Sequence, residues 1–340
     1  MKEVLATDKY SKSIFRKSPE EILAEELGAG YLEYRKRWHD AKGFAYRPLF
    51  PIHLDLEIIY ACNLKCVMCP FGDPTYKHPE YKGRGLDIDM IKRLIKEGVG
   101  QGLRAVRFNA LTEPLLVKEL PDLIRFARDA GVIDVFLTTN GMLMDEECSR
   151  RLIAAGTTHI MVSLDAATPG TYAAIRKGGD YSRVVKNIES FLRIRSEMGR
   201  RLPLLRLTFS KMKPNAHEVD LFLKQWEGKV DYIAVAGYLN NIHDQKQSEA
   251  LAINPPVARE IGSFHCWQPW ARCTIYANGD VFPCCMNYGR YAPVGNIYKE
   301  TMTEIWQSPK VKAIQDLHKT GEYFKHPTCR ECVSKRDVFQ

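Results

Sequence analysis

The sequence of 340 residues lacks any long hydrophobic run. No window approaches the about 18 consecutive apolar residues that read as a membrane-spanning helix, and residues 1–21 contain no apolar stretch of signal-peptide length. We therefore expect a cytoplasmic protein without a membrane partner. Repeats and low-complexity tracts are also absent. The hydrophobic fraction of 45% allows one large domain and one smaller domain, each with its own core.

The sequence also lacks a block of basic residues. Its formal net charge is +8, but the lysines and arginines are spread through the whole chain. This distribution favours a solvated surface, with some affinity for anionic substrates, over a nucleic-acid-binding patch. We expect no nucleic-acid partner.

The ten cysteines are unevenly distributed. They cluster at 62–69 and at 266–332, and only Cys148 stands apart. Disulfides are rare in a reducing cytoplasm, so this clustering indicates metal ligation.

Between residues 52 and 240, short apolar runs alternate with amphipathic stretches. The runs predict six strands, at 54–60, 105–109, 134–138, 159–164, 204–209 and 231–236, and the stretches include predicted helices at 90–99, 120–130, 146–155 and 181–195. This alternation predicts an α/β fold with a parallel sheet, curved or partly closed, and an active site at the carboxyl ends of the strands.

The two ends of the chain differ from this middle part. Ser18 with the following Pro-Glu-Glu predicts a helix over 18–42, with a buried stripe that includes Leu32. After 255, the sequence predicts a hairpin over 274–282 on an Asn-Gly turn and one helix over 302–317. We predict an N-terminal helical extension (1–51), a core domain (52–255) and a C-terminal domain (256–340).

The stretch CNLKCVMCP places Cys62, Cys66 and Cys69 close together without a fourth cysteine or a histidine. A structural zinc site needs four protein ligands. Three thiolates can instead hold a cubane [4Fe-4S] cluster, which leaves one iron open to a substrate or cofactor. Zinc completed by a distant residue is the alternative.

This CxxxCxxC loop, directly after the first strand, resembles the signature of the radical S-adenosylmethionine (SAM) enzymes, and the resemblance covers about residues 52–240. It implies a partial (β/α)6 TIM-like barrel. It also implies that SAM chelates the open iron and that its reductive cleavage gives a 5'-deoxyadenosyl radical, which abstracts hydrogen from a substrate C–H bond.

Other residues are assigned roles by the same resemblance. The segment Asn-Ala-Leu-Thr112-Glu113-Pro stands where the family has Gly-Gly-Glu-Pro, so Glu113 is expected to accept from the SAM amino group. The absent glycines put the backbone contacts of this segment with SAM in doubt. Further SAM contacts are implied for Met68, Asn140, Ser163, Asp165 and Arg176.

The C-terminal cysteines resemble the auxiliary-cluster module called SPASM, or its shortened form called twitch. Four thiolates, from Cys266, Cys284, Cys329 and Cys332, would saturate one further [4Fe-4S] cluster. A four-cysteine zinc ribbon is the alternative.

A cluster whose four irons are all bound by cysteine is suited to electron transfer. This favours oxidation of a secondary alcohol as the reaction. The cysteine pattern also resembles that of the 2-deoxy-scyllo-inosamine dehydrogenase type. Epimerisation is the rival reaction, with Cys285 or Cys273 as hydrogen donor. Alternation in the fifth strand places Arg206, Thr208 and Ser210 on one face. If that face is internal, it suits a sugar, a nucleotide-sugar or an aminocyclitol; a solvent-facing edge strand is the alternative.

Three further expectations complete this interpretation. A flavodoxin or ferredoxin is expected as the external one-electron donor. A peptide substrate remains an alternative, although about 50 residues before the core seem few for the leader-binding domain of many peptide-modifying relatives. A zinc-binding interaction protein is the non-enzymatic alternative.

Overall fold

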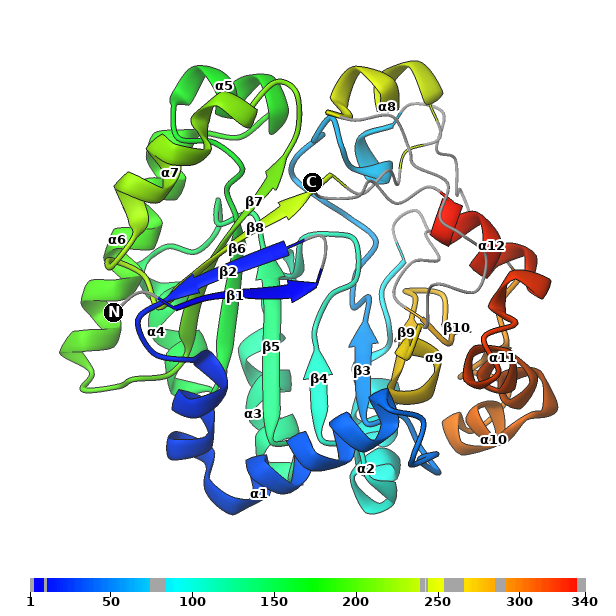
Figure 1. Ribbon diagram of the computed structural model, residues 1–340. Helices are drawn as coiled ribbons and strands as arrows, with labels where there is room; N and C mark the ends of the chain where they lie inside the picture. Colours follow the sequence, from blue (N-terminus) through cyan, green and yellow to red (C-terminus); the bar gives the residue numbers. More distant parts are fainter. Residues whose placement is uncertain are drawn as a thin grey trace.

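The computed structural model describes residues 3–8, 11–73, 84–238, 242, 244–253, 266–284 and 292–334. Within these residues, eleven strands form one sheet in the order β1-β2-β8-β7-β6-β5-β4-β3-β9-β10-β11 (Figure 1). Its parallel centre consists of β3 (His53–Leu56), β4 (Ala105–Arg107), β5 (Asp134–Thr139), β6 (His159–Ser163), β7 (Leu204–Lys211) and β8 (Tyr232–Gly237). The sheet does not close, because β8 pairs with β2 and β3 pairs with β9. The predicted α/β fold with a parallel sheet, which resembles a partial TIM-like barrel, is confirmed.

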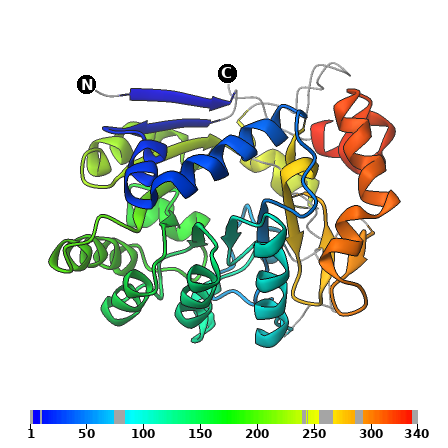
Figure 2. The same ribbon diagram turned by 90° about the horizontal axis from the view of Figure 1, so that it is seen from below.

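Helices cover one face of the parallel strands. They are α2 (Ile88–Gln101), α3 (Leu120–Ala130), α4 (Glu146–Ala154), α6 (Tyr181–Glu197) and α7 (Val219–Trp226). In Figure 2 these cyan and green helices lie on one side of the sheet, whereas the blue N-terminal segment lies on the other. Aspartates cap α2, α4 and α6 by accepting from a backbone N–H three residues later, which satisfies an otherwise unpaired donor.

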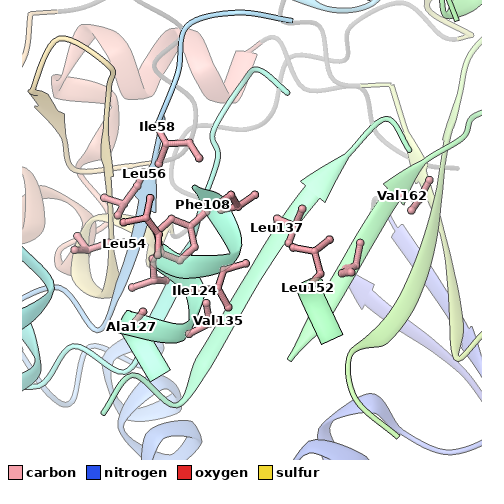
Figure 3. Packing of buried hydrophobic residues seen from close by; sticks show 14 of the residues in the cluster. Leu54, Leu56, Ile58, Phe108, Ile124, Ala127, Val135, Leu137, Leu152 and Val162 are labelled. Atoms are coloured by element: carbon pink, nitrogen blue, oxygen red, sulfur yellow. The ribbon is translucent and has the colours of Figure 1, made fainter. Parts of the chain in front are cut away.

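The main hydrophobic core lies between these helices and the sheet (Figure 3). Alternate strand residues, such as Leu54 and Leu56 of β3 or Val135 and Leu137 of β5, contribute to it and are fully buried. Because neighbouring strand residues point to opposite faces, the residues between them point away from the helices. We call that second face the inner face.

Helix α1 (Pro19–Lys42) packs against residues at the amino ends of the strands. Gly28 interrupts it with a φ of 69°. The buried stripe runs through Tyr31, Tyr34 and Trp38 at helical spacing, so Leu32 lies outside it and is 58% exposed. The expectation of a buried Leu32 was therefore wrong, and Ser18 makes no side-chain capping bond. An antiparallel hairpin of β1 (Glu3–Asp8) and β2 (Ser11–Phe15), which the sequence did not predict, precedes the helix.

The C-terminal part extends the same sheet. The predicted hairpin is present as β9 (Arg272–Ile275) and β10 (Asp280–Phe282), with Gly279 at a φ of 87°, and β11 (Gly295–Asn296) pairs with β10. Helices α9 (Gln268–Ala271), α10 (Met302–Gln307), α11 (Pro309–Lys319) and α12 (Pro327–Ser334) complete this part. The expected single helix over 302–317 is two helices, because Pro309 favours an extended Ser308, which caps α11.

Shorter elements surround the carboxyl ends of the parallel strands. Helices α5 (Pro169–Ile175) and α8 (Gln245–Leu251) lie at this end of the sheet in Figure 1. The 3-10 turns are η1 (Pro70–Gly72), η2 (Pro114–Leu116), η3 (Ala216–Glu218) and η4 (Tyr323–Lys325). Among the described residues, no helix has the length and apolar character needed to cross a bilayer.

Candidate active site

The three N-terminal cysteines lie on the loop between β3 and η1. Two backbone hydrogen bonds fix this loop to the end of α5, from Lys65 N to Lys177 O (2.9 Å) and from Val67 N to Ile175 O (3.0 Å). Gly72 approaches the loop so closely that a Cβ atom there would lie 2.3 Å from the carbonyl oxygen of Cys66. The loop geometry therefore requires glycine at this position.

The thiols of this loop are close enough to influence each other. The pKa of Cys62 is raised to about 11 and that of Cys69 to about 12. Burial is the largest cause of both shifts, and the neighbouring Cys66 contributes to both. Thiolates here need compensating positive charge, which metal ions supply. In the described part of the chain, no three Cys, His, Asp or Glu side chains are grouped as around a single ion. Three cysteines in one loop match the ligand set of a cubane cluster with one open iron, whereas structural zinc takes four protein ligands.

Glu113 is a buried carboxyl group beside this loop. It accepts hydrogen bonds from Thr139 Oγ1 (2.7 Å), from Asn140 N (2.8 Å) and from Leu115 N (3.1 Å). Burial raises its pKa to about 7, although the hydrogen bonds from Asn140 and Thr139 oppose this shift. The Asn140 side chain also donates to Asn63 Oδ1 (2.7 Å) in the cysteine loop. A buried carboxylate in this position can accept from an ammonium group.

Glu57, which the sequence analysis missed, takes up the backbone donors of the neighbouring segment. Its carboxylate accepts from Leu111 N (2.5 Å), from Thr112 N (3.2 Å) and from the Thr112 hydroxyl. These amides are therefore engaged within the chain. The signal in the sequence was the alternation Leu-Asp-Leu-Glu in β3 and beyond it, which places Asp55 and Glu57 on one face.

Arg176 and Asp165 form a buried pair on the other side of the loop. The guanidinium donates to Asp165 Oδ2 through Nε (3.1 Å), and Nη1 lies 3.6 Å from Cys66 Sγ. Burial opposes the charge of Arg176, but Asp165 and Cys66 outweigh it and keep its pKa above the usual value. Asp165, at a φ of 58°, also accepts from Ser210 N (2.7 Å) and so fixes the end of β7.

Two further predicted SAM contacts lie close by. Ser163 ends β6 and pairs in register with Thr208 of β7. Met68 packs against a small apolar cluster that contains Ile175, Met212 and Tyr238. Both positions adjoin the carboxyl ends of the strands.

The inner face carries an unusual concentration of arginine. Arg107 Nε lies 2.8 Å from Asp55 Oδ1, and Arg272 of β9 binds the other oxygen of the same carboxylate. Burial would raise the pKa of Asp55, but the two arginines hold it well below the usual value. His53 also contacts Asp55 (3.0 Å), yet burial lowers its pKa to about 4, so it adds no positive charge near neutral pH.

Arg206 has no such carboxylate partner in the part of the chain that the structure describes. It lies on the inner face of β7, opposite Tyr232, with which it interacts. Its Nε is buried and has no hydrogen-bond acceptor, and it forms no ion pair, among the described residues. Leu205, Leu207 and Phe209 are fully buried in the main core, so Arg206, Thr208 and Ser210 share the inner face. The alternative of a solvent-facing edge strand is wrong, since β7 lies between β6 and β8.

Three of the four C-terminal cysteines predicted as ligands influence one another. Burial raises the pKa of Cys329 to about 12, with contributions from Cys284 and Cys332. Cys329 and Cys332 lie on α12, Cys284 follows β10, and Cys266 precedes α9. As in the N-terminal loop, the described residues contain no grouping suited to a single ion. Several thiols from separate segments fit a cluster site.

The two predicted hydrogen donors are Cys273 and Cys285. Cys273 pairs with Leu54 and is fully buried in the main core, where its thiol donates to Phe282 O (3.3 Å). It therefore faces the helices, away from Asp55 and the inner face. Cys285 lies outside the described residues.

Comparisons with known proteins agree with this geometry. Residues 56–209 match the Radical SAM superfamily, and residues 266–333 match SPASM, an iron-sulfur cluster-binding domain. The chain is thus an iron-sulfur enzyme of the radical SAM superfamily. More particularly, it belongs to those members that carry a SPASM domain. The predictions of SAM, a [4Fe-4S] cluster and an auxiliary cluster are confirmed, whereas the ligand residues assigned to each stay predictions.

Solved structures with the same fold include two radical SAM enzymes. The Streptococcus suis protein SuiB, bound to its precursor peptide SuiA, has a TM-score of 0.59 and 15% identity, over 88% of this chain and 72% of SuiB. The enzyme anSMEcpe with bound AdoMet has a TM-score of 0.59 and 17% identity, over 83% of this chain and 87% of that one. At this identity the likeness concerns the fold alone.

Curated relatives are more similar in sequence but over less of their length. A probable GTP 3',8-cyclase of Methanococcus maripaludis (strain C6) is 31% identical over 55% of this chain and 56% of its own. The GTP 3',8-cyclase of Alkaliphilus metalliredigens is 32% identical over 42% of this chain and 43% of its own. The chain thus spans about half the length of the curated relatives it matches.

Proposed function

We propose that this radical SAM enzyme acts on a hydroxylated small molecule that carries an anionic group, such as a nucleotide or nucleotide-sugar, and oxidises a secondary alcohol in it. The observation that carries the substrate class is Arg206, a positively charged side chain on the inner face without a carboxylate partner among the described residues. An anionic substrate would supply the missing partner.

The chain's own residues would divide the work of binding. Cys62, Cys66 and Cys69 would hold the catalytic cluster, and Glu113 would accept from the SAM ammonium group. Cys266, Cys284, Cys329 and Cys332 would hold the auxiliary cluster. Bound there, SAM and the clusters would supply one hydrogen abstraction and one electron acceptance, which convert an alcohol to a ketone once the hydroxyl proton is released to water.

Three observations support a nucleotide-like substrate over a peptide. Arg206, Thr208 and Ser210 offer hydrogen-bond donors along one strand. The curated relatives are named GTP 3',8-cyclases, which are proteins acting on a nucleotide. SuiB was solved with its precursor peptide, but its likeness to this chain concerns the fold alone. We propose a cytoplasmic setting with a flavodoxin- or ferredoxin-type electron donor.

The proposal is tested with anaerobically purified enzyme. A brown protein with about eight irons is expected for two cubane clusters, and 5'-deoxyadenosine should form with SAM and dithionite. Nucleotides and nucleotide-sugars should raise that rate, whereas aminocyclitols, which are cationic, and peptides should not. Arg206→Ala should weaken substrate binding about 10- to 100-fold, as expected for a lost charge-assisted hydrogen bond. The exposed Arg200→Ala serves as the matched control.

The products decide between the reactions. Dehydrogenation should give a ketone without deuterium from deuterated water. Deuterium in an epimerised product, with activity lost in Cys285→Ala, would instead establish the epimerase. A cyclised nucleotide, or turnover only with a peptide, would likewise overturn the proposed reaction. A colourless protein that retains zinc would exclude both predicted clusters.

A further inference from the structure

A buried histidine contacts one of the predicted ligands of the auxiliary cluster. His318 of α11 is 1% exposed, and its Nε2 lies 3.3 Å from Cys329 Sγ. His326 Nδ1 lies 3.7 Å from the same sulfur. His326 is more exposed, so the two imidazoles contact one sulfur from different environments.

The His318 ring is held in place from two directions. It stacks on the buried ring of Tyr323, with 5.9 Å between centroids and an interplanar angle of 12°. One turn earlier, the Gln315 side chain donates to Pro269 O (3.0 Å), and the main-chain carbonyl of Gln315 accepts from Trp270 Nε1 (2.8 Å). The helix that carries His318 is therefore tied to α9, and the imidazole stays directed at Cys329.

We propose that His318 donates a hydrogen bond through Nε2–H to the Cys329 thiolate of the auxiliary [4Fe-4S] cluster and thereby raises the cluster's reduction potential. A donor withdraws electron density from a ligating sulfur and stabilises the more negative, reduced state. Only the tautomer with hydrogen on Nε2 can donate. His318 is thus a positioning residue that makes the auxiliary cluster a better electron acceptor.

This inference rests on the ligand assignment within the proposed function, but not on the substrate or on alcohol oxidation. The rival role for His318 is direct ligation of iron in place of a cysteine. In that case its removal would cost the cluster itself. The two roles therefore predict different iron contents.

The experiment uses the full chain with Cys62, Cys66 and Cys69 replaced by alanine, so that the auxiliary cluster alone contributes to the signal. Potentials are measured by redox titration followed by electron paramagnetic resonance, without SAM or substrate. His318→Phe keeps a ring but removes the donor. It should retain the iron and shift the potential to a more negative value. His318→Gln, which keeps an N–H donor, should give a smaller shift.

His326→Asn is the matched control, because it alters the more exposed imidazole at the longer distance. Its shift should be smaller than that of His318→Phe. An unchanged potential in His318→Phe with full iron content would overturn the proposal. The proposal would also be overturned if both His318 variants lost the cluster and the parent chain showed nitrogen hyperfine coupling. Those two results together would show that His318 ligates iron. This experiment does not measure 5'-deoxyadenosine formation. A negative result for His318 would therefore not affect the test of the proposed function.

Discussion

At the scale of single residues, the site depends on carboxyl groups whose surroundings control their charge. Glu113 is buried and its pKa is raised to about 7, yet three hydrogen bonds fix its orientation. Its protonated form cannot accept from an ammonium group through both oxygens. The charge available to the proposed SAM contact therefore changes within the physiological pH range.

The affinity for SAM should consequently increase as the pH rises. With a pKa of about 7 for Glu113, the ionised fraction, and with it the apparent affinity, increases about tenfold between pH 6 and pH 8. Anaerobic titration of SAM at both pH values checks this, and Glu113→Gln should bind weakly with a flatter profile. An equal pH dependence in wild type and Glu113→Gln would contradict the role.

Glu57 supports Glu113 indirectly by holding the preceding backbone. Glu57→Gln replaces one accepting oxygen by a donor, which leaves either Leu111 N or the Thr112 donors without a partner. A lost charge-assisted hydrogen bond costs about 1–3 kcal/mol, so the melting temperature should fall and SAM should bind more weakly. Thermal unfolding and SAM titration measure both effects. The exposed Glu189→Gln should change neither, and an unchanged Glu57→Gln would exclude this support.

Local sequence patterns predicted part of this arrangement. Parallel topology alone places residues at the ends of predicted strands, or in the segments that follow them, at one edge of the sheet. These residues are Glu113, Asn140, Ser163 and Arg176. Glu57 and the two arginines on Asp55 were not predicted as part of the site. Their contacts join segments that lie about 50 to over 200 residues apart, and no local pattern specifies such pairs.

At the scale of elements, the cysteine loop is rigid because other backbone segments surround it. It is bonded to residues 175–177 on one side and touched by Gly72 on the other. These contacts fix the backbone path of the loop.

Gly72→Ala should displace the loop, since the new Cβ would lie 2.3 Å from the Cys66 carbonyl oxygen. We expect loss of the N-terminal cluster, about four of about eight irons, with the auxiliary cluster retained. Iron analysis and electron paramagnetic resonance check this outcome. The control is Gly100→Ala in α2, where nothing lies within 4 Å of an added Cβ. Equal iron content in the two variants would contradict the prediction.

Elements with clear end signals were predicted closely, and those shaped by packing were not. Helices α2, α3, α4 and α6 begin and end near the predicted residues because capping aspartates or terminal glycines mark several of their ends. The β1–β2 hairpin forms against β8, so its presence depends on a distant strand. Gly28 and Pro309 are present in the sequence as helix-breaking residues, but the predicted helices at 18–42 and 302–317 ran through them without a kink or a break.

At the scale of the whole molecule, the SPASM domain and the radical SAM sheet are continuous. Strand β9 pairs with β3, and Arg272 shares Asp55 with Arg107. Trp306 Nε1 also donates to Pro48 O (3.0 Å), which ties α10 to the segment after α1. Loss of either part should therefore destabilise the other.

Asp55→Asn tests this continuity, because it leaves two half-buried guanidinium groups without their shared counter-charge. Removing one partner of a buried ion pair costs about 3–5 kcal/mol. Anaerobic denaturation should show one transition at lower denaturant for both regions, whereas Arg193→Ala, at an exposed position of α6, should leave the transition unchanged. Two separate transitions, with only one of them shifted, would show that the regions unfold independently.

The pairing of β9 with β3 also has a consequence during synthesis. Asp55 and Arg272 are 217 positions apart, so the nascent chain emerges with one edge of β3 bare for most of translation. The cysteines predicted for the second cluster follow those of the first by about 200 residues or more, so the order of the codons also gives the two sets of ligands an order of synthesis.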